Sequence, residues 1–261
     1  MKQLQDKCRG SLVGGAVGDA LGYPVEFVDS FEEIRARYGE SGVVAYDLSY
    51  QWLDVDADCR YALVSDDTQM TLYTAEGLLE AVQNGKPVIP TICNAYLAWF
   101  GLQVGKKIKI SYDSNLTKIE RFNQRRAPGN TCLSALNLIF RGIEPMNSSK
   151  GCGGVMRVAP IGIYGACHEW IPEETVRIAG EAAELTHLHP LSTYSSAALA
   201  VIVQQCMTTT NVDAETFKTI VNKSLDVLTD VYGEAAPYMD DFRRIIKKAI
   251  SLEDNRLADW E

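Results

Sequence analysis

The sequence predicts an all-α protein. Apolar residues recur with the 3.6-residue period of a helix in a series of segments along the 261 residues. Several segments open with helix start signals, whereas the alternation of apolar and polar residues that marks a strand is weak. The predicted helices cover residues 66–84, 88–103, 131–141, 173–186, 191–208, 214–231 and 238–252.

Glycines recur every four residues near the N-terminus, at Gly10, Gly14, Gly18 and Gly22. If this stretch is helical, the four lie on one face, and another helix can approach its backbone closely. Because each glycine costs a helix roughly 1 kcal/mol relative to alanine, the stripe favours close packing at a site. Asp19 would then be a supporting residue among small neighbours.

The helix over 66–84 is preceded by Ser65 and opens with the adjacent carboxylates Asp66 and Asp67. In a purely structural reading, Ser65 caps the helix and the carboxylates complement the positive end of its dipole. In a functional reading, the same oxygens hold a metal ion. The segment alone does not decide between the two.

Start signals support several of the later helices. They are Pro90 and Pro172 in first turns, Asn130 before 131–141 and Asp213 before 214–231. The only strand candidates are 42–48 and 106–112.

Two long loops interrupt the helices, and such loops often carry function. The first, Tyr23 to Val64, contains Glu26, Asp54, Asp56 and Asp58. The second, Gly142 to Pro160, contains "KGCGGVMR". Its glycines permit positive φ and an inward-facing set of amides that suits a phosphate or diphosphate, with Lys150 or Arg157 in support. A tight irregular turn is the open alternative.

Cys152 in this loop is a poor candidate for a nucleophile, because the sequence places no base beside it. The histidines are His168, His187 and His189. "THLHP" lacks the further ligands of a zinc site. We expect His187 to end a helix, and to project into a pocket or cap the helix C-terminus.

Composition narrows the classes of function. A net charge of -9 argues against a nucleic-acid surface. Seven scattered cysteines without a C-x-x-C pair favour a reducing, cytoplasmic compartment and argue against structural zinc. No apolar run is long enough to cross a membrane. With no repeat or linker, we expect a single domain over residues 1–261.

Four ordered segments together resemble the ADP-ribosylglycohydrolase family, which includes the dinitrogenase reductase-activating glycohydrolase and the ADP-ribosylarginine hydrolases. They are "GSLVGGAVGDALGYPVEF" (10–27), "SDDTQMTL" (65–72), "GNTCLSAL" (129–136) with "SKGCGGVMRVAPIG" (149–162), and "ELTHLHP" (184–190). The resemblance covers about residues 8 to 208 and is specific, because the motifs are long and in the family's order.

The resemblance implies a compact, orthogonal all-α bundle around two Mg²⁺ ions, which hydrolyses the bond between ADP-ribose and a modified side chain. Ser65, Asp66 and Asp67 match the family's metal ligands, and Asp67 and Glu26 match its catalytic positions. The substrate would be an ADP-ribosylated protein or ADP-ribose. The residues that match its substrate-binding positions are Gly151, Cys152, Gly153, Gly154, Val155, Met156 and His187.

The residue types suit this chemistry. Mg²⁺ prefers oxygen ligands, often including waters. A metal-held water is a good nucleophile at neutral pH, and carboxylates stabilise the oxocarbenium character that develops as the leaving group departs. Glu26 would position the substrate or transfer a proton, and the sequence leaves both roles open.

One family element, a late Asp-x-Asp followed by Thr or Ser, has no match. Asp240 and Asp241 begin an ordinary amphipathic helix. Either the chain is C-terminally incomplete or its metal site is degraded, and the intact first-half ligands favour an incomplete chain. The leading hypothesis is a Mg²⁺-dependent hydrolase of ADP-ribosyl-arginine. The alternative is a catalytically impaired ADP-ribose-binding or partner-occluding protein, and a purely structural helical domain is disfavoured by the ordered motifs.

Overall fold

The computed structural model describes residues 2–48, 61–105, 108, 110 and 112–251. Within these residues, every regular element is an α-helix or a short 3-10 helix, which confirms the all-α prediction. The chain divides into two compact units, Met1–Pro145 and Met146–Glu261. The single-domain expectation stays a prediction, and each unit is described by itself.

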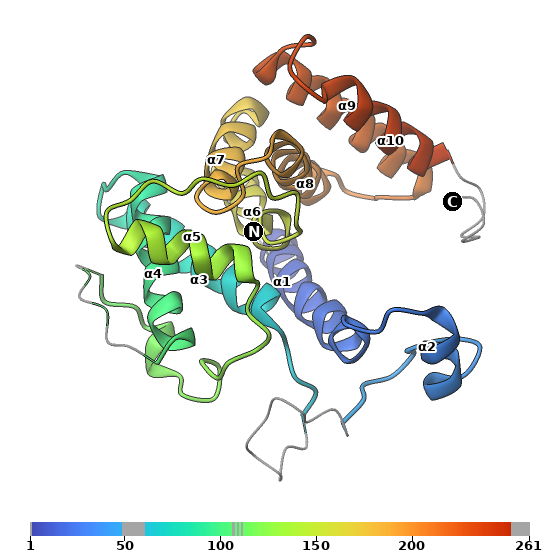
Figure 1. Cartoon of the computed structure of the whole chain (residues 1–261). Helices are drawn as coiled ribbons and strands as arrows, with labels where there is room; N and C mark the ends of the chain where they lie inside the picture. Colours follow the sequence, from blue (N-terminus) through green and yellow to red (C-terminus); the bar gives the residue numbers. More distant parts are fainter. Residues whose placement is uncertain (1, 49–60, 106–107, 109, 111, 252–261) are drawn as a thin grey trace. The chain divides into compact units, whose positions relative to one another are not determined.

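Unit 1 is built around the antiparallel pair α3 (Asp66–Gln83) and α4 (Val88–Gln103), which pack along their length (Figure 1). α1 (Lys2–Gly22) contacts α3, and α5 (Asn130–Phe140) contacts α4. Short elements complete the unit: η1 (Tyr23–Val25), α2 (Phe31–Tyr38) and η2 (Leu116–Lys118).

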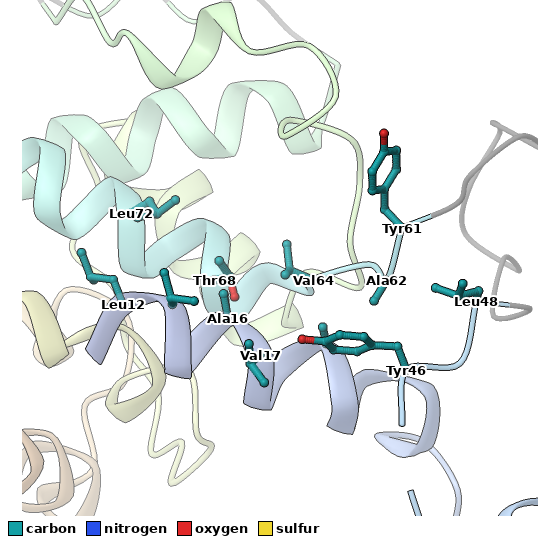
Figure 2. Close-up of a pocket in the computed structure, with 12 residues that line it drawn as sticks. Leu12, Ala16, Val17, Tyr46, Leu48, Tyr61, Ala62, Val64, Thr68 and Leu72 are labelled. Atoms are coloured by element: carbon teal, nitrogen blue, oxygen red, sulfur yellow. The ribbon is translucent and has the colours of Figure 1, made fainter. Parts of the chain in front are cut away.

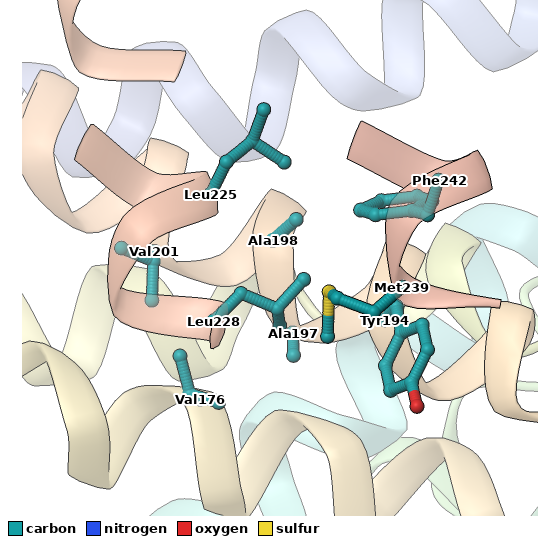
Figure 3. Close-up of a cluster of buried hydrophobic side chains, with 9 residues drawn as sticks. All are labelled: Val176, Tyr194, Ala197, Ala198, Val201, Leu225, Leu228, Met239 and Phe242. Atoms are coloured by element: carbon teal, nitrogen blue, oxygen red, sulfur yellow. The ribbon is translucent and has the colours of Figure 1, made fainter. Parts of the chain in front are cut away.

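Unit 2 is centred on α8 (Pro190–Thr208). Its neighbours are η3 (Val155–Arg157), α6 (Ala159–Cys167), α7 (Pro172–Glu184), α9 (Ala214–Tyr232) and α10 (Met239–Ser251). Figure 3 shows side chains of α7, α8, α9 and α10 converging on one apolar cluster. Leu225 and Leu228 of α9 and Val201 of α8 are at most 1% exposed there. The amphipathic stripe of α9 therefore closes this core.

The predicted helices all form, with ends that shift by one or two residues. The N-terminal helix α1, which the sequence analysis left as a possibility, also forms, and two observed helices, α2 and α6, were not predicted. α2 is only eight residues long and buries none of them, although Ser30 caps it by accepting from Glu33 N. α6 is apolar nearly all round and mostly buried, so it has no polar face to reveal a period.

The cap predictions have mixed outcomes. Asp213 caps α9 by accepting from Thr216 N at 2.8 Å, and Pro172 is the first residue of α7, as predicted. The Asn130 cap is wrong, because Asn130 is the first helical residue and Gly129 occupies the cap position without a side-chain bond. The strand over 42–48 is also wrong, since these described residues form no strand, and 106–112 lies partly outside the described residues.

Within the described residues of unit 1, close packing on the N-terminal glycine face is not seen. A Cβ added at Gly10, Gly14 or Gly18 of α1 would meet no described atom within 4 Å. Close approach occurs elsewhere, at glycines without a periodic pattern. A Cβ on Gly77 would lie 2.8 Å from Ile92 Cα, where α3 meets α4. A Cβ on Gly162 of α6 would collide with the carbonyl oxygen of Ala200 in α8.

None of the helices in the described part of the chain combines the length and the hydropathy that crossing a bilayer requires.

The glycine contacts give a matched pair of stability predictions. We expect Gly77→Ala to lower the free energy of unfolding by about 1–3 kcal/mol, because the methyl group overlaps the α4 backbone. Gly10→Ala, in open space on α1, is expected to raise it by up to about 1 kcal/mol. Urea unfolding of both variants measures this, and a Gly77→Ala protein as stable as the parent would contradict the packing.

Candidate functional site

The start of α3 gathers the acidic residues that the sequence singles out. Ser65 is the N-cap, and its Oγ accepts from the Asp67 amide at 3.1 Å. The Asp66 amide donates to the Arg126 carbonyl at 2.9 Å, and one Asp66 carboxylate oxygen accepts from the Gly129 amide at 3.0 Å. Asp66 is only 3% exposed. Ser65 thus caps the helix while the two aspartates lie beside it, so the capping role and a metal-binding role are compatible.

Asp19 extends from α1 to the same turn of α3. Both of its carboxylate oxygens accept from the Ser65 amide, at 3.0 and 2.9 Å. One of them also accepts from the amide of Thr68, at 3.1 Å, and from its hydroxyl. Asp19 therefore lies next to the predicted metal ligands because it bonds directly to the first turn of α3. The glycine face of α1 is not what brings it there.

Glu26 follows η1 and is the solvent-exposed member of the group. Although the residue is exposed, its carboxyl group is partly shielded from water, and this partial burial, followed by the carboxylates of Asp67 and Asp19, raises its pKa to about 7. This coupling places Glu26 electrostatically within the same cluster. We call Asp19, Glu26, Asp66 and Asp67 the carboxylate cluster.

Burial is also the main cause of the altered pKa values of the two aspartates. It raises the pKa of Asp66 to about 7; the Gly129 amide opposes this, and the charges of Asp67, Glu26 and Asp19 add to it. Burial and then Asp19 raise the pKa of Asp67 to about 6. The cluster thus holds negative charge at a cost that a bound cation would reduce.

The donor chemistry of the cluster fits Mg²⁺ better than a soft metal, because every candidate ligand is a carboxylate or hydroxyl oxygen. Within the described residues, no three His, Cys, Asp or Glu side chains are already arranged around one point as a metal centre. Mg²⁺ commonly keeps several waters. Ser65, Asp66 and Asp67 therefore fit as part of a coordination shell rather than as a complete one.

The loop before α5 contributes residues that sequence reasoning did not assign to the site. Arg126 and Gly129 enclose Asp66 through the two backbone bonds described above. The buried Gln69 of α3 anchors this loop by donating to the carbonyls of Phe122 and Gln124, the latter at 2.9 Å. The only sequence signal was "GNTCLSAL", which locates Gly129 in a motif but not against Asp66.

Ala127, between Arg126 and Gly129, has a φ of 49°. The left-handed region is unfavourable for alanine, more so before a proline, and Pro128 follows. The backbone is therefore bent into a strained turn at the point where it surrounds Asp66.

Unit 2 contains the glycine loop and the "TH" pair. His187 is 3% exposed, and its Nδ1 lies 2.8 Å from Thr186 Oγ1. Its Nε2 would lie 3.5 Å from a Cβ added at Gly151. Asn147, which the sequence analysis did not single out, joins the two segments because its Nδ2 donates to the Thr186 carbonyl at 2.9 Å. The loop and His187 are therefore neighbours, which the sequence alone did not indicate.

The glycine loop itself differs from the predicted nest of amides. Gly151, Gly153 and Gly154 are all described, and none has a positive φ. A Cβ on Gly154 would instead lie 3.1 Å from Ala183 Cβ, so this glycine permits close packing. Cys152 is exposed, and Val155 and Met156 are half-buried in η3.

The suggested role of Arg157 in binding phosphate is wrong. Arg157 is fully buried, and its Nη2 donates to the carbonyl of Ala182 at 2.9 Å and to Thr186 Oγ1 at 2.8 Å. It satisfies the C-terminal end of α7. Burial, followed by the charge of Arg157, lowers the pKa of His187 to about 4, so this imidazole is neutral at physiological pH.

An apolar groove of about 820 Å³ lies beside α1 and α3 in unit 1 (Figure 2). Leu12, Ala16 and Val17 of α1 and Leu72 of α3 line it, and Thr68 is the point where it meets the first turn of α3. No residue of the carboxylate cluster is among the residues that line it. The groove is therefore a separate feature.

Comparison with known proteins gives two matches. The family model described as ADP-ribosylglycohydrolase matches residues 1–260. The chain is also 29% identical over 203 residues to an uncharacterized protein of Archaeoglobus fulgidus, an alignment that covers 77% of this chain. The chain spans about half the length of this curated relative, with 55% of the relative covered.

The raised pKa values predict a specific pH dependence. Asp66 and Asp67 have higher pKa values in the folded protein than the ordinary value of 3.8 that we expect in the unfolded chain, so the folded state binds more protons. The free energy of unfolding of the metal-free protein should therefore fall as pH rises from about 4 to 7. Asp66→Asn, which keeps an acceptor for Gly129, should raise the free energy of unfolding at pH 7.5 by on the order of 2 kcal/mol. Urea unfolding across pH tests this, with the exposed Asp29→Asn as control. Unchanged or lower stability of Asp66→Asn would contradict the electrostatic analysis.

His187 gives a second prediction. Because Thr186 Oγ1 accepts from Arg157, its hydroxyl hydrogen can be donated to His187 Nδ1, and we therefore expect the ring proton on Nε2. We expect the ¹⁵N shifts of the ring to remain those of the neutral Nε2–H tautomer from pH 8 to about 5.5, given the low pKa of the group. In urea-unfolded protein the same ring should titrate near 6.5. A folded-state titration near 6.5 would contradict the buried arrangement.

Proposed function

The chain belongs to the ADP-ribosylglycohydrolase family, and we propose that it hydrolyses the glycosidic bond that links ADP-ribose to a modified arginine side chain, using Mg²⁺. The observation that carries this proposal is the carboxylate cluster at the start of α3, in which the buried Asp66 and the half-buried Asp67 lie among other carboxylates and have raised pKa values. Such an arrangement is unfavourable unless a cation or a reaction uses it.

Ser65, Asp66 and Asp67 would hold Mg²⁺, with waters completing the shell. When bound, the ion would supply an activated water and align the ribose hydroxyls. Asp66 is suited to hold a fixed position, because backbone groups of the 126–129 turn engage its amide and its carboxylate. The Asp67 amide donates to Ser65 Oγ and its carbonyl accepts from Thr71 Oγ1, whereas no described group bonds its carboxylate, which supports a role for the carboxylate toward the ligand.

Glu26 is suited to proton transfer. It is the exposed member of the cluster, so substrate and solvent can reach it, and its raised pKa lies near neutral pH. In the proposed reaction its carboxyl group would exchange a proton with the attacking water or with the departing guanidine nitrogen. The carboxylates around it would stabilise positive charge that develops at the anomeric carbon.

His187 and the glycine loop would recognise the ribose and diphosphate. A neutral His187 with its proton on Nε2 offers a hydrogen-bond donor rather than a charge, which suits a sugar hydroxyl. The exposed Gly151 lies beside this ring, and its amide donates to Ser149 Oγ at 3.3 Å, so the loop would present its backbone to the substrate in a fixed position. Arg157 contributes indirectly, since it fixes Thr186 and thereby the His187 ring.

A binding protein without turnover is the second candidate. It is favoured by the absence, among the described residues, of a ready-made centre of three metal-ligating side chains. Such a protein would bind ADP-ribose or cover a partner without releasing product.

Release of free ADP-ribose from an ADP-ribosylated arginine protein tests the proposal. We expect turnover with Mg²⁺, loss of turnover with a chelator, and a fall in kcat of at least about 100-fold in Asp66→Asn and in Asp67→Asn. The exposed Asp29→Asn serves as the matched control. Saturable ADP-ribose binding without turnover would favour the binding protein, and release that a chelator does not affect would contradict the role of Mg²⁺.

A further inference from the structure

We propose that Asp19 is a positioning residue that fixes the first turn of α3 from outside the helix, and so sets the geometry of the Asp66 and Asp67 carboxylates. The inference rests on the function proposed above and adds a role for a residue that does not touch the ion or the substrate.

The amides at the start of α3 are completely accounted for. The first amides of a helix have no partner within it and need acceptors from elsewhere. Asp66 N donates to the Arg126 carbonyl, and Asp67 N to Ser65 Oγ. The amides of Ser65 and Thr68 donate to Asp19, which lies 46 and 49 residues earlier in the chain. Asp19 therefore holds the amides that flank the two aspartates on either side.

The contacts of Asp19 also distinguish it from a metal ligand. A carboxylate offers about four lone-pair sites. The amide of Ser65 contacts both oxygens of Asp19, and the amide and hydroxyl of Thr68 contact the second oxygen. One oxygen of Asp19 thus receives one donor contact and the other receives three, which together use about as many lone-pair sites as a carboxylate has. The Asp66 carboxylate receives one such bond and the Asp67 carboxylate receives none from the described residues, so these two remain the candidates for ligands.

Simple capping does not explain the choice of a charged residue here. Ser65 already provides a neutral side-chain cap, and a further negative charge beside Asp66 and Asp67 is repulsive. What Asp19 adds is a rigid link between α1 and the first turn of α3, made of charge-assisted hydrogen bonds. A rotation of that turn would move both carboxylates together, and small displacements of this kind strongly affect a site.

The link can be tested through either partner. Asp19→Ala removes all of the bonds, whereas Thr68→Val removes only the hydroxyl donor and keeps the shape of the side chain. Thr68→Ser restores the hydroxyl, and Asp6→Asn, on the same helix but outside the cluster, is the matched control. If Asp19→Ala fails to fold, the Thr68→Val and Thr68→Ser pair decides the question.

We expect Asp19→Ala and Thr68→Val to weaken Mn²⁺ binding by roughly 10-fold, measured by electron paramagnetic resonance. The amides of Ser65 and Thr68 should exchange hydrogen faster by a similar factor in Asp19→Ala. For ADP-ribose release, kcat should fall with little change in KM, whereas a merely structural role would leave the kinetics of the folded fraction unchanged. Thr68→Ser and Asp6→Asn should behave as the parent protein does.

The outcomes separate this inference from the proposed function. Parent-like Mn²⁺ affinity and amide exchange in Asp19→Ala and Thr68→Val would overturn the role of Asp19, whatever the catalytic activity. A parent protein that binds Mn²⁺ but releases no ADP-ribose would overturn the hydrolase proposal, while the Mn²⁺ affinities of the variants would still decide the role of Asp19. A parent protein that binds no Mn²⁺ would overturn both.

Discussion

The start of α3 concentrates negative charge where water is largely excluded, and the surrounding part of unit 1 is arranged to hold that charge. Asp66 is almost fully buried, and the backbone of the 126–129 turn engages it from one side. Asp19 engages the adjacent amides from another side. The helix N-terminus favours anions, yet neighbouring carboxylates repel each other. The repulsion among the carboxylates lowers the stability of the folded protein, and a bound cation would relieve it.

The supporting contacts extend well beyond the acidic residues. Gln69 lies one turn into α3 and is fully buried, with its amide nitrogen bound to the loop at 122–124. Its oxygen accepts from Trp99 of α4 at 3.0 Å. The α3–α4 pair, the loop and the Asp66 turn are thus connected through one side chain. In unit 2, Arg157 has a comparable role, because a single buried guanidinium links the end of α7 to the Thr186–His187 pair.

Local features were predictable from the sequence, and long-range contacts were not. The Ser65 cap and the first-turn aspartates depend on adjacent residues, so a short motif reveals them. The apolar period gave the bounds of α9 closely, whereas α6 was missed because a helix buried on most sides has no period.

The glycine stripe of α1 was misleading, since spacing shows which residues share a face but not whether anything packs there. Arg157 was misassigned because a basic residue after a glycine loop suggests phosphate binding, and only the fold shows that α7 needs its donors. The contacts of Asp66 with the 126–129 turn join residues that are 60 and 63 positions apart, which no local pattern encodes.

The most direct test of the central claim is the number of protons released when Mg²⁺ or Mn²⁺ binds to the intact chain. Carboxyl groups with pKa values of about 6 to 7 must lose their protons to bind a metal ion. Calorimetric titrations in buffers of different ionisation enthalpy should therefore show proton release at pH 6 that vanishes at pH 8. Absence of binding, or binding at pH 6 without proton release, would contradict the assignment of the carboxylate cluster as the cation site.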